Sequence, residues 1–208
     1  MKDAVQLKKQ KAHVKKLNNT MKSFMKDKYN EYIEKLNMSL KSDVQEQIQL
    51  LADALLEAWK NKKTVFICGN GGSAGNAIHL ANDFNYGIDK KNGIGLKIDA
   101  LTANQSVITC IANDEGYENI FSQQLKVKAN KGDTLIVLSG SGNSANVVKA
   151  LLTGNELGLK TFAILGFSGG KCKELAQVPI HFPIDDMQVA EDLQVIVGHM
   201  CMQWLCNK

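Results

Sequence analysis

The pattern of apolar and polar residues changes once along this chain, close to residue 64. Before that point the apolar residues recur at helical spacing. Residues 4–39 contain no glycine or proline, which predicts a helix with a break near residues 18 and 19. A second helix is predicted from Ser42, whose spacing to Gln45 fits a capping box, to about Lys60.

After residue 64, short apolar stretches alternate with helical ones. Strands that are apolar throughout and are separated by helices indicate a parallel sheet covered on both faces. We therefore expect an α/β fold with a doubly wound, five-stranded parallel sheet, and ligands at the carboxyl ends of its strands. The expected strands are TVFIC, GLKIDAL, TLIVLS, KTFAILGF and VPIHFP, and the expected helices include 73–84, 144–157, 170–176 and 187–205.

The same pattern suggests the domain organisation. Residues 1–40 are expected to form a helical segment, and residues 41–208 to form one domain. The apolar stripes of the two leading helices need a surface on which to be buried, and contacts in a homo-oligomer would supply it.

Charge is distributed unevenly. Residues 1–35 hold ten lysines against four acidic residues, which is +6 within a chain of net charge +4. No aromatic interleaving accompanies these lysines, so a solvated helix face is favoured over binding to nucleic acid. All 25 basic residues are lysine. Without arginine, an anion must be held by backbone N–H groups, hydroxyls and lysine charges.

Composition also bears on location. The chain contains no apolar run long enough for a membrane span and no apolar region of a signal peptide. Its five cysteines lack a CxxC spacing, which favours free thiols in a reducing compartment over disulfides or a zinc knuckle. We therefore expect a cytoplasmic protein without a membrane partner.

Two glycine-rich loops carry the candidate chemistry. The stretch GNGGS (69–73) lies between the first strand and its helix, where glycines let the backbone approach an anion. SGSGNS (139–144) occupies the same place after TLIVL, with Ser144 expected to cap the next helix. A strand-to-helix turn alone also explains either loop. Two of them on neighbouring strands point more strongly to a phosphate.

Together the loops resemble those of the sugar isomerase (SIS) domain family. Five segments follow in the order and spacing of its phosphoheptose isomerase branch: CGNGGSAGNAIHLANDF, ITCIANDEGYENIFSQQL, GDTLIVLSGSGNSANVVKA, GGKCKELA and DLQVIVGHM. The resemblance covers residues 40–205. It implies a cytoplasmic homotetramer that converts sedoheptulose 7-phosphate to D-glycero-D-manno-heptose 7-phosphate through an enediol.

The resemblance also implies roles for individual residues. Asp83 and His199 would move protons. A zinc ion would be held by His79, Asp83, Glu191 and His199. The remaining contacts to the phosphosugar would come from Asn70, Gly71, Gly72, Ser73, Asn104, Ser139, Gly140, Ser141, Ser144 and Glu191.

Several of these positions depart from the family pattern. This chain has Asp83 where the family has a glutamate and Glu191 where it has a glutamine. It has Asn104 in place of an aspartate and Gly140 in place of a threonine. Because eight residues span about 12 Å of straight helix, Glu191 and His199 should not reach one ion from the same chain. One of them is expected to complete a neighbouring subunit's site.

Two other functions stay open at this point. One is a non-catalytic SIS module that binds a phosphosugar or a protein, like the bacterial partner of the replication initiator. The altered sugar-side residues favour it, and the retention of His79 and His199 opposes it. The other is an isomerase of a different phosphosugar.

Overall fold

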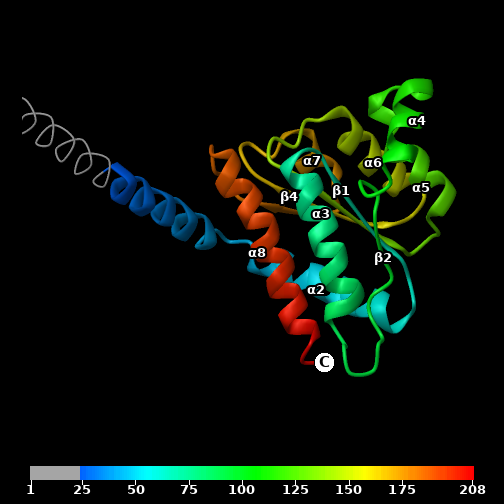
Figure 1. The fold of residues 1–208 in the computed structure, drawn as a ribbon, viewed down its shortest axis with the longest axis horizontal. Helices are drawn as coiled ribbons and strands as arrows, with labels where there is room; N and C mark the ends of the chain where they lie inside the picture. The colour runs from blue at the N-terminus through cyan, green and yellow to red at the C-terminus, as the bar shows by residue number, and fades with distance from the viewer. Residues whose placement is uncertain (1–23) are drawn as a thin grey trace, which may run out of the picture. The chain divides into compact units, whose positions relative to one another are not determined.

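The structure, a computed structural model, describes residues 24–208 and has a parallel sheet at its centre (Figure 1). The strand order is β2-β1-β3-β4-β5, and every neighbouring pair is parallel. All residues of β1 and β3 are buried, as expected for central strands covered on both faces. The strands are β1 Val65–Gly69, β2 Ile98–Ala100, β3 Thr134–Ser139, β4 Lys160–Leu165 and β5 Val178–His181.

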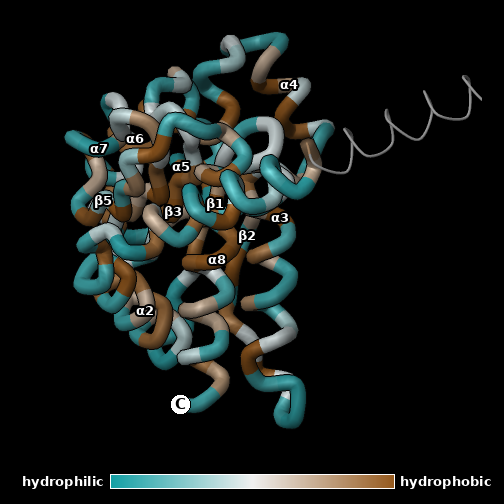
Figure 2. The backbone as a smooth tube through the Cα atoms, turned by 90° about the vertical axis from the view of Figure 1, so that its left-hand side faces the viewer, coloured by the Kyte–Doolittle hydropathy of each residue, from teal (hydrophilic) through white to brown (hydrophobic). Residues whose placement is uncertain are grey.

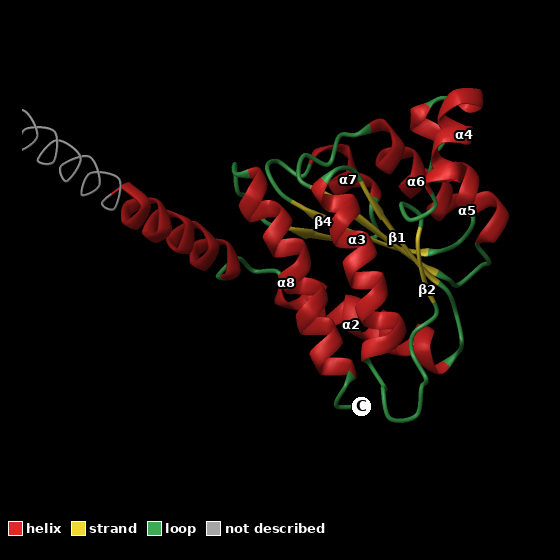
Figure 3. Cartoon of the chain, viewed as in Figure 1, coloured by secondary structure: helices red, strands yellow, loops and turns green. Residues whose placement is uncertain are grey.

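Helices cover both faces of this sheet, so the predicted α/β architecture is confirmed (Figure 3). Helices α2, α3 and α8 pack on one side, and α5, α6 and α7 on the other. Figure 2 shows the apolar strands enclosed between helices of mixed polarity. The helices are α2 Gln45–Lys60, α3 Gly72–Asn82, α4 Gln105–Glu115, α5 Ser122–Lys128, α6 Ala145–Glu156, α7 Gly170–Leu175 and α8 Met187–Leu205.

Two short turns of helix were not foreseen. A π-helix, Asp83–Gly87, continues directly from α3, and a 3-10 helix, Tyr117–Asn119, precedes α5. The sequence predicted an α-helix up to residue 84 instead. Single π turns are frequent at functional positions, and this one begins at a candidate site residue.

Two predicted helix caps were wrong. Helix α2 begins at Gln45 with Val44 at its N-cap position, so the predicted capping box of Ser42 and Gln45 does not form. Ser144 does occupy the N-cap position of α6, but its side chain makes no capping hydrogen bond. In the first case the N-cap lies two residues later than predicted, whereas at Ser144 the position and the extended backbone are those of an N-cap and only the side-chain hydrogen bond is missing.

The chain divides after Leu40 into two compact units, the second of which runs from Lys41 to Lys208. Residues 24–40 are helical, and the rest of the predicted helix lies outside the described residues. Nowhere in residues 24–208 is a helix both long and apolar enough to cross a membrane.

Candidate functional site

The two glycine-rich loops lie side by side at the carboxyl edge of the sheet. Strands β1 and β3 are neighbours, with Gly69 in register with Leu138. The side-chain amides of Asn70 and Asn146 join the loops through two reciprocal hydrogen bonds of 2.8 Å. The Tyr117 hydroxyl donates to the same Asn70 oxygen at 2.9 Å. The predicted adjacency of the loops is thus present, and three side chains hold it.

The first loop requires glycine for its backbone. Gly71 has φ +55°, a conformation that side chains with a Cβ rarely adopt. Gly72 opens α3, and a Cβ there would overlap the Glu191 carboxylate. An acidic side chain therefore already lies against the N-terminus of α3.

The second loop uses its hydroxyls partly to hold its own shape. Ser139 Oγ accepts from Gly142 N at 3.0 Å, and Ser141 Oγ accepts from Asn143 N at 3.3 Å. Gly142 has φ +67° and lies against the backbone of Gly169. Each serine O–H group can still donate a hydrogen bond to an anion.

Gly140 makes room for a neighbouring side chain. A Cβ at this position would come within 2.6 Å of Met187 Sδ. The space that a larger residue would use in this loop is therefore occupied by the first residue of α8. Met187 is half-exposed at 39%, so its flexible end can move aside.

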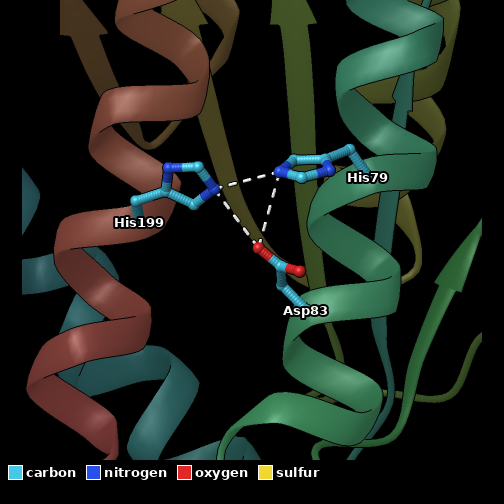
Figure 4. A group of neighbouring side chains, drawn as sticks. All are labelled: His79, Asp83 and His199. Carbon is cyan, nitrogen blue, oxygen red and sulfur yellow. Dashed lines mark hydrogen bonds and ion pairs between the residues drawn. The ribbon is translucent and has the colours of Figure 1, made fainter.

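Three ionisable side chains meet where α3 and α8 pack together (Figure 4). His79 Nε2 and His199 Nε2 lie 3.0 Å apart. Asp83 Oδ2 lies 3.5 Å from His79 Nε2 and 3.2 Å from His199 Nε2. His79 lies near the end of α3, and Asp83 is the first residue of the π-helix that continues α3, so these side chains, four residues apart, point to the same side. His199 comes from α8 and points toward the other two side chains (Figure 4).

This arrangement fits a divalent metal. One atom from each side chain lies within 4.8 Å of the other two, and no other such group occurs among the described residues. Two imidazoles and one carboxylate are one of the ligand sets found in catalytic zinc sites. In such sites the fourth coordination position is open to water or substrate. The side chains of His79 and His199 are 50% and 42% exposed, so a ligand can approach.

Two predicted site residues make other contacts within this chain. Glu191 was predicted as a zinc ligand, but its carboxylate packs against Gly72 and is not part of the three-residue group. Helix α8 is continuous from Met187 to Leu205, so Glu191 and His199 stay two turns apart. Ser73 is buried, and its hydroxyl accepts a hydrogen bond from Gln194 at 3.0 Å.

Asn104 lies at the start of α4. Its Oδ1 accepts from Val107 N at 3.2 Å and caps that helix. It also lines a pocket of about 470 Å³ beside β2, together with Asp99, Ser106, Gln124 and Lys128. Its predicted contact with the sugar stays a prediction.

Sequence reasoning missed three residues that organise the site: Tyr117, Asn146 and Gln194. Asn146 lies two residues after the second loop, and this position could have suggested a role. The other two lie far from both loops in sequence, and although both fall within segments that resemble the family, neither was given a role. Their importance becomes visible only through their contacts.

The cysteines offer no reactive thiolate in this site. All five are free, as predicted, and Cys68, Cys172 and Cys201 are buried. Burial raises the pKa of the Cys172 and Cys201 thiols to about 12. Burial also raises the pKa of Cys68, which directly precedes the first loop. A thiol in this state is a poor nucleophile.

Comparison with known proteins gives a consistent result. The sequence model of the SIS domain family matches residues 28–166. A phosphoheptose isomerase of Clostridium acetobutylicum is 37% identical over 183 residues, which cover 86% of this chain and 92% of that protein. A phosphoheptose isomerase of Geotalea daltonii is 40% identical over 168 residues, which cover 81% of this chain and 85% of that protein.

Solved structures agree with this match. The phosphoheptose isomerase GmhA from Neisseria gonorrhoeae superposes with a TM-score of 0.83 at 27% identity, covering 90% of this chain and all of that one. A phosphoheptose isomerase from Francisella tularensis shares the fold, with a TM-score of 0.81 at 23% identity. The superposition covers 89% of this chain and 98% of that one.

Proposed function

Because this chain belongs to the phosphoheptose isomerases of the SIS domain family, we propose that it isomerises sedoheptulose 7-phosphate to D-glycero-D-manno-heptose 7-phosphate. The observation that carries this proposal is the meeting of His79, Asp83 and His199 on helices that lead from the same sheet edge. The two loops at that edge supply the anion-binding groups.

The phosphate would be bound by the second loop. Ser139, Ser141 and Ser144 bring hydroxyls, and the start of α6 brings unpaired backbone N–H groups. Ser144 suits this role because its side chain is not used as a cap. The first loop, with Glu191 against Gly72, would face the uncharged hydroxyls of the sugar, since a carboxylate repels phosphate.

The reaction requires a proton to leave the carbon beside the carbonyl and another to return on its neighbour. Asp83 or His199 would accept the first proton, which leaves an enediol. The protonated group would then return a proton to the adjacent carbon, while the imidazole exchanges protons with the two oxygens. A zinc ion held by His79, Asp83 and His199 would polarise those oxygens.

Proton exchange tests this proposal directly. Purified protein is incubated in D₂O with sedoheptulose 7-phosphate, with and without added zinc, and deuterium incorporation is followed by NMR. We expect deuterium to appear at the carbon that is protonated in the product. The absence of exchange with any C5 to C7 ketose phosphate would refute the isomerase function.

We further propose that the chain acts as a cytoplasmic homotetramer. The helix in residues 24–40 by itself exposes several large apolar side chains, among them Phe24, Met25, Tyr29 and Met38. Exposed apolar surfaces of this kind often mark protein–protein contacts, and a second copy of this chain would cover them. The free thiols suit a reducing compartment. Light scattering of the purified chain measures the oligomeric state, and a monomer at micromolar concentration would contradict it.

A non-catalytic SIS module is the second candidate. It is favoured by the shorter Asp83 side chain and by Asn104, whose oxygen already caps α4. In that case the wild-type protein would show no turnover. It would still bind a protein partner, and His199→Ala would leave that binding intact.

A further inference from the structure

Helices α3 and α8 are joined by a buried amide that none of the roles above uses. Gln194 on α8 is only 1% exposed. Its Nε2 donates to Ser73 Oγ at 3.0 Å, and its Oε1 accepts from Asn76 Nδ2 at 3.0 Å. Both ends of one side chain of α8 are therefore bonded to α3.

Asn76 strengthens this connection. Its Nδ2 also donates to the backbone oxygen of Glu191 at 3.0 Å, so the two amides bridge the helices at three points. Leaving a buried polar group without a hydrogen-bond partner destabilises the packed arrangement. One register of α3 against α8 therefore satisfies these groups, and a shift of either helix breaks several bonds together.

The same register brings the ionisable side chains together. His79 follows Asn76 by three residues, and His199 follows Gln194 by five. Since each pair lies on one rigid helix, sliding one helix past the other would separate the imidazoles by a similar distance. Metal ligation tolerates deviations of only about 0.2 Å from the preferred distances.

We propose that Gln194 is a positioning residue that fixes the register of α3 on α8 and thereby holds His79 and Asp83 at ligand distance from His199. This inference rests on the proposed function, in which these three side chains bind the metal. Through Ser73, the same amide also ties the first glycine-rich loop to the ligand group.

Cobalt binding provides a readout that does not require turnover. Wild-type protein and the variants Gln194→Leu and Asn76→Ala are titrated with Co²⁺, whose visible absorption reports tetrahedral ligation. The matched control is Gln124→Leu. Gln124 is also buried, at 3%, and its Nε2 donates to Leu101 O and Ile120 O at 2.9 and 2.8 Å, away from α3 and α8.

We expect Gln194→Leu and Asn76→Ala to weaken Co²⁺ binding about tenfold or more, the range found when outer-shell partners of metal ligands are removed. Gln124→Leu should lower the melting temperature without changing Co²⁺ affinity. Unchanged affinity in folded Gln194→Leu and Asn76→Ala would overturn the inference. A wild-type protein that takes up no Co²⁺ would overturn it as well.

The positioning role and the isomerase function are tested by separate measurements, so either can be refuted without the other. If the wild type binds Co²⁺ and the variants lose it, but no ketose phosphate exchanges its proton, the positioning role stands and the proposed reaction is wrong. If the wild type isomerises its substrate and Gln194→Leu binds Co²⁺ normally, only the positioning role is wrong.

Discussion

Leu80 of α3 packs against the backbone of Gly198 in α8, with no room for a methyl group between them. The neighbouring residues are His79 and His199, whose Nε2 atoms lie 3.0 Å apart. The absence of a side chain at Gly198 therefore allows the close helix contact on which the ligand group depends.

We predict that Gly198→Ala destabilises the protein by about 1–3 kcal/mol, as expected for overpacking a buried contact. It should also weaken metal binding, because the added methyl group pushes the helices apart. Urea unfolding measures the first effect and Co²⁺ titration the second.

Gly75→Ala on α3 is the matched control. A Cβ at Gly75 would meet no atom within 4 Å. This variant should therefore be stabilised by about 0.4–1 kcal/mol, since alanine loses less backbone entropy in a helix. If both glycine variants behave alike, the helix contact is not the cause.

His199→Ala should lower the turnover number by about 10²-fold or more, the usual contribution of general acid–base catalysis. The substrate KM should change little, because the phosphate is held by the second loop. His181→Ala serves as a comparison. That imidazole bonds Phe167 O at 2.9 Å and lies outside the ligand group. A similar loss in both variants would contradict a chemical role for His199.

Asp83→Asn preserves the shape of the side chain but removes its charge. Because the carboxylate lies 3.5 and 3.2 Å from the two imidazoles, we expect weaker metal binding and a turnover number lower by about 10²-fold. Asp83→Glu retains the charge with a longer reach, and should remain active. Full activity of Asp83→Asn in the proton-exchange assay would exclude a role for the carboxylate.

Asn146→Leu should loosen the connection between the two loops. Asn146 is 1% exposed, and the change leaves the Asn70 amide without its reciprocal partner. We expect a loss of about 1–3 kcal/mol in the free energy of unfolding and a higher KM for the phosphosugar. Tyr117→Phe removes a single exposed hydrogen bond, so its effect on both quantities should be smaller.

Thiol reactivity should divide the cysteines into two groups. At pH 8, iodoacetamide should modify the exposed Cys110 and Cys206 in the native protein, and the three buried cysteines only after denaturation. A hydrogen bond to Asp114 raises the pKa of the Cys110 thiol, so its reaction should speed up as the pH rises. Mass spectrometry of peptides identifies the sites, and rapid native labelling of Cys201 would contradict its burial.

The buried thiols also predict how stability depends on pH. The pKa of Cys172 and Cys201 is raised from 9.0 to about 12. Above pH 9 the unfolded chain therefore releases protons that the folded chain keeps, and the free energy of unfolding falls as the pH rises toward 12. Cys201→Ala should reduce that slope in urea titrations between pH 9 and 11. An unchanged slope would show that this thiol does not contribute.

The periodicity of apolar residues was sufficient to predict all five strands, and it placed α8 at residues 187–205 as observed. Strand and helix periods are local properties, so the sequence carries them directly. The spacing of glycines and serines after β1 and β3 likewise located both loops, because parallel neighbouring strands end at one edge.

The resemblance suggested that His79, Asp83 and His199 share one ion, but the contact itself, and the exclusion of Glu191 from it, are properties of the tertiary structure. His79 and His199 are 120 residues apart, and their contact depends on the register of α3 against α8, which the amide of Gln194 and the gap at Gly198 set together. The continuous helix α8 keeps Glu191 two turns from His199, and the packing of α8 on α3 brings the Glu191 carboxylate to Gly72 instead. Packing between distant segments has no local period, so the sequence alone determined the elements and the loops, and close contact between helices determined the site.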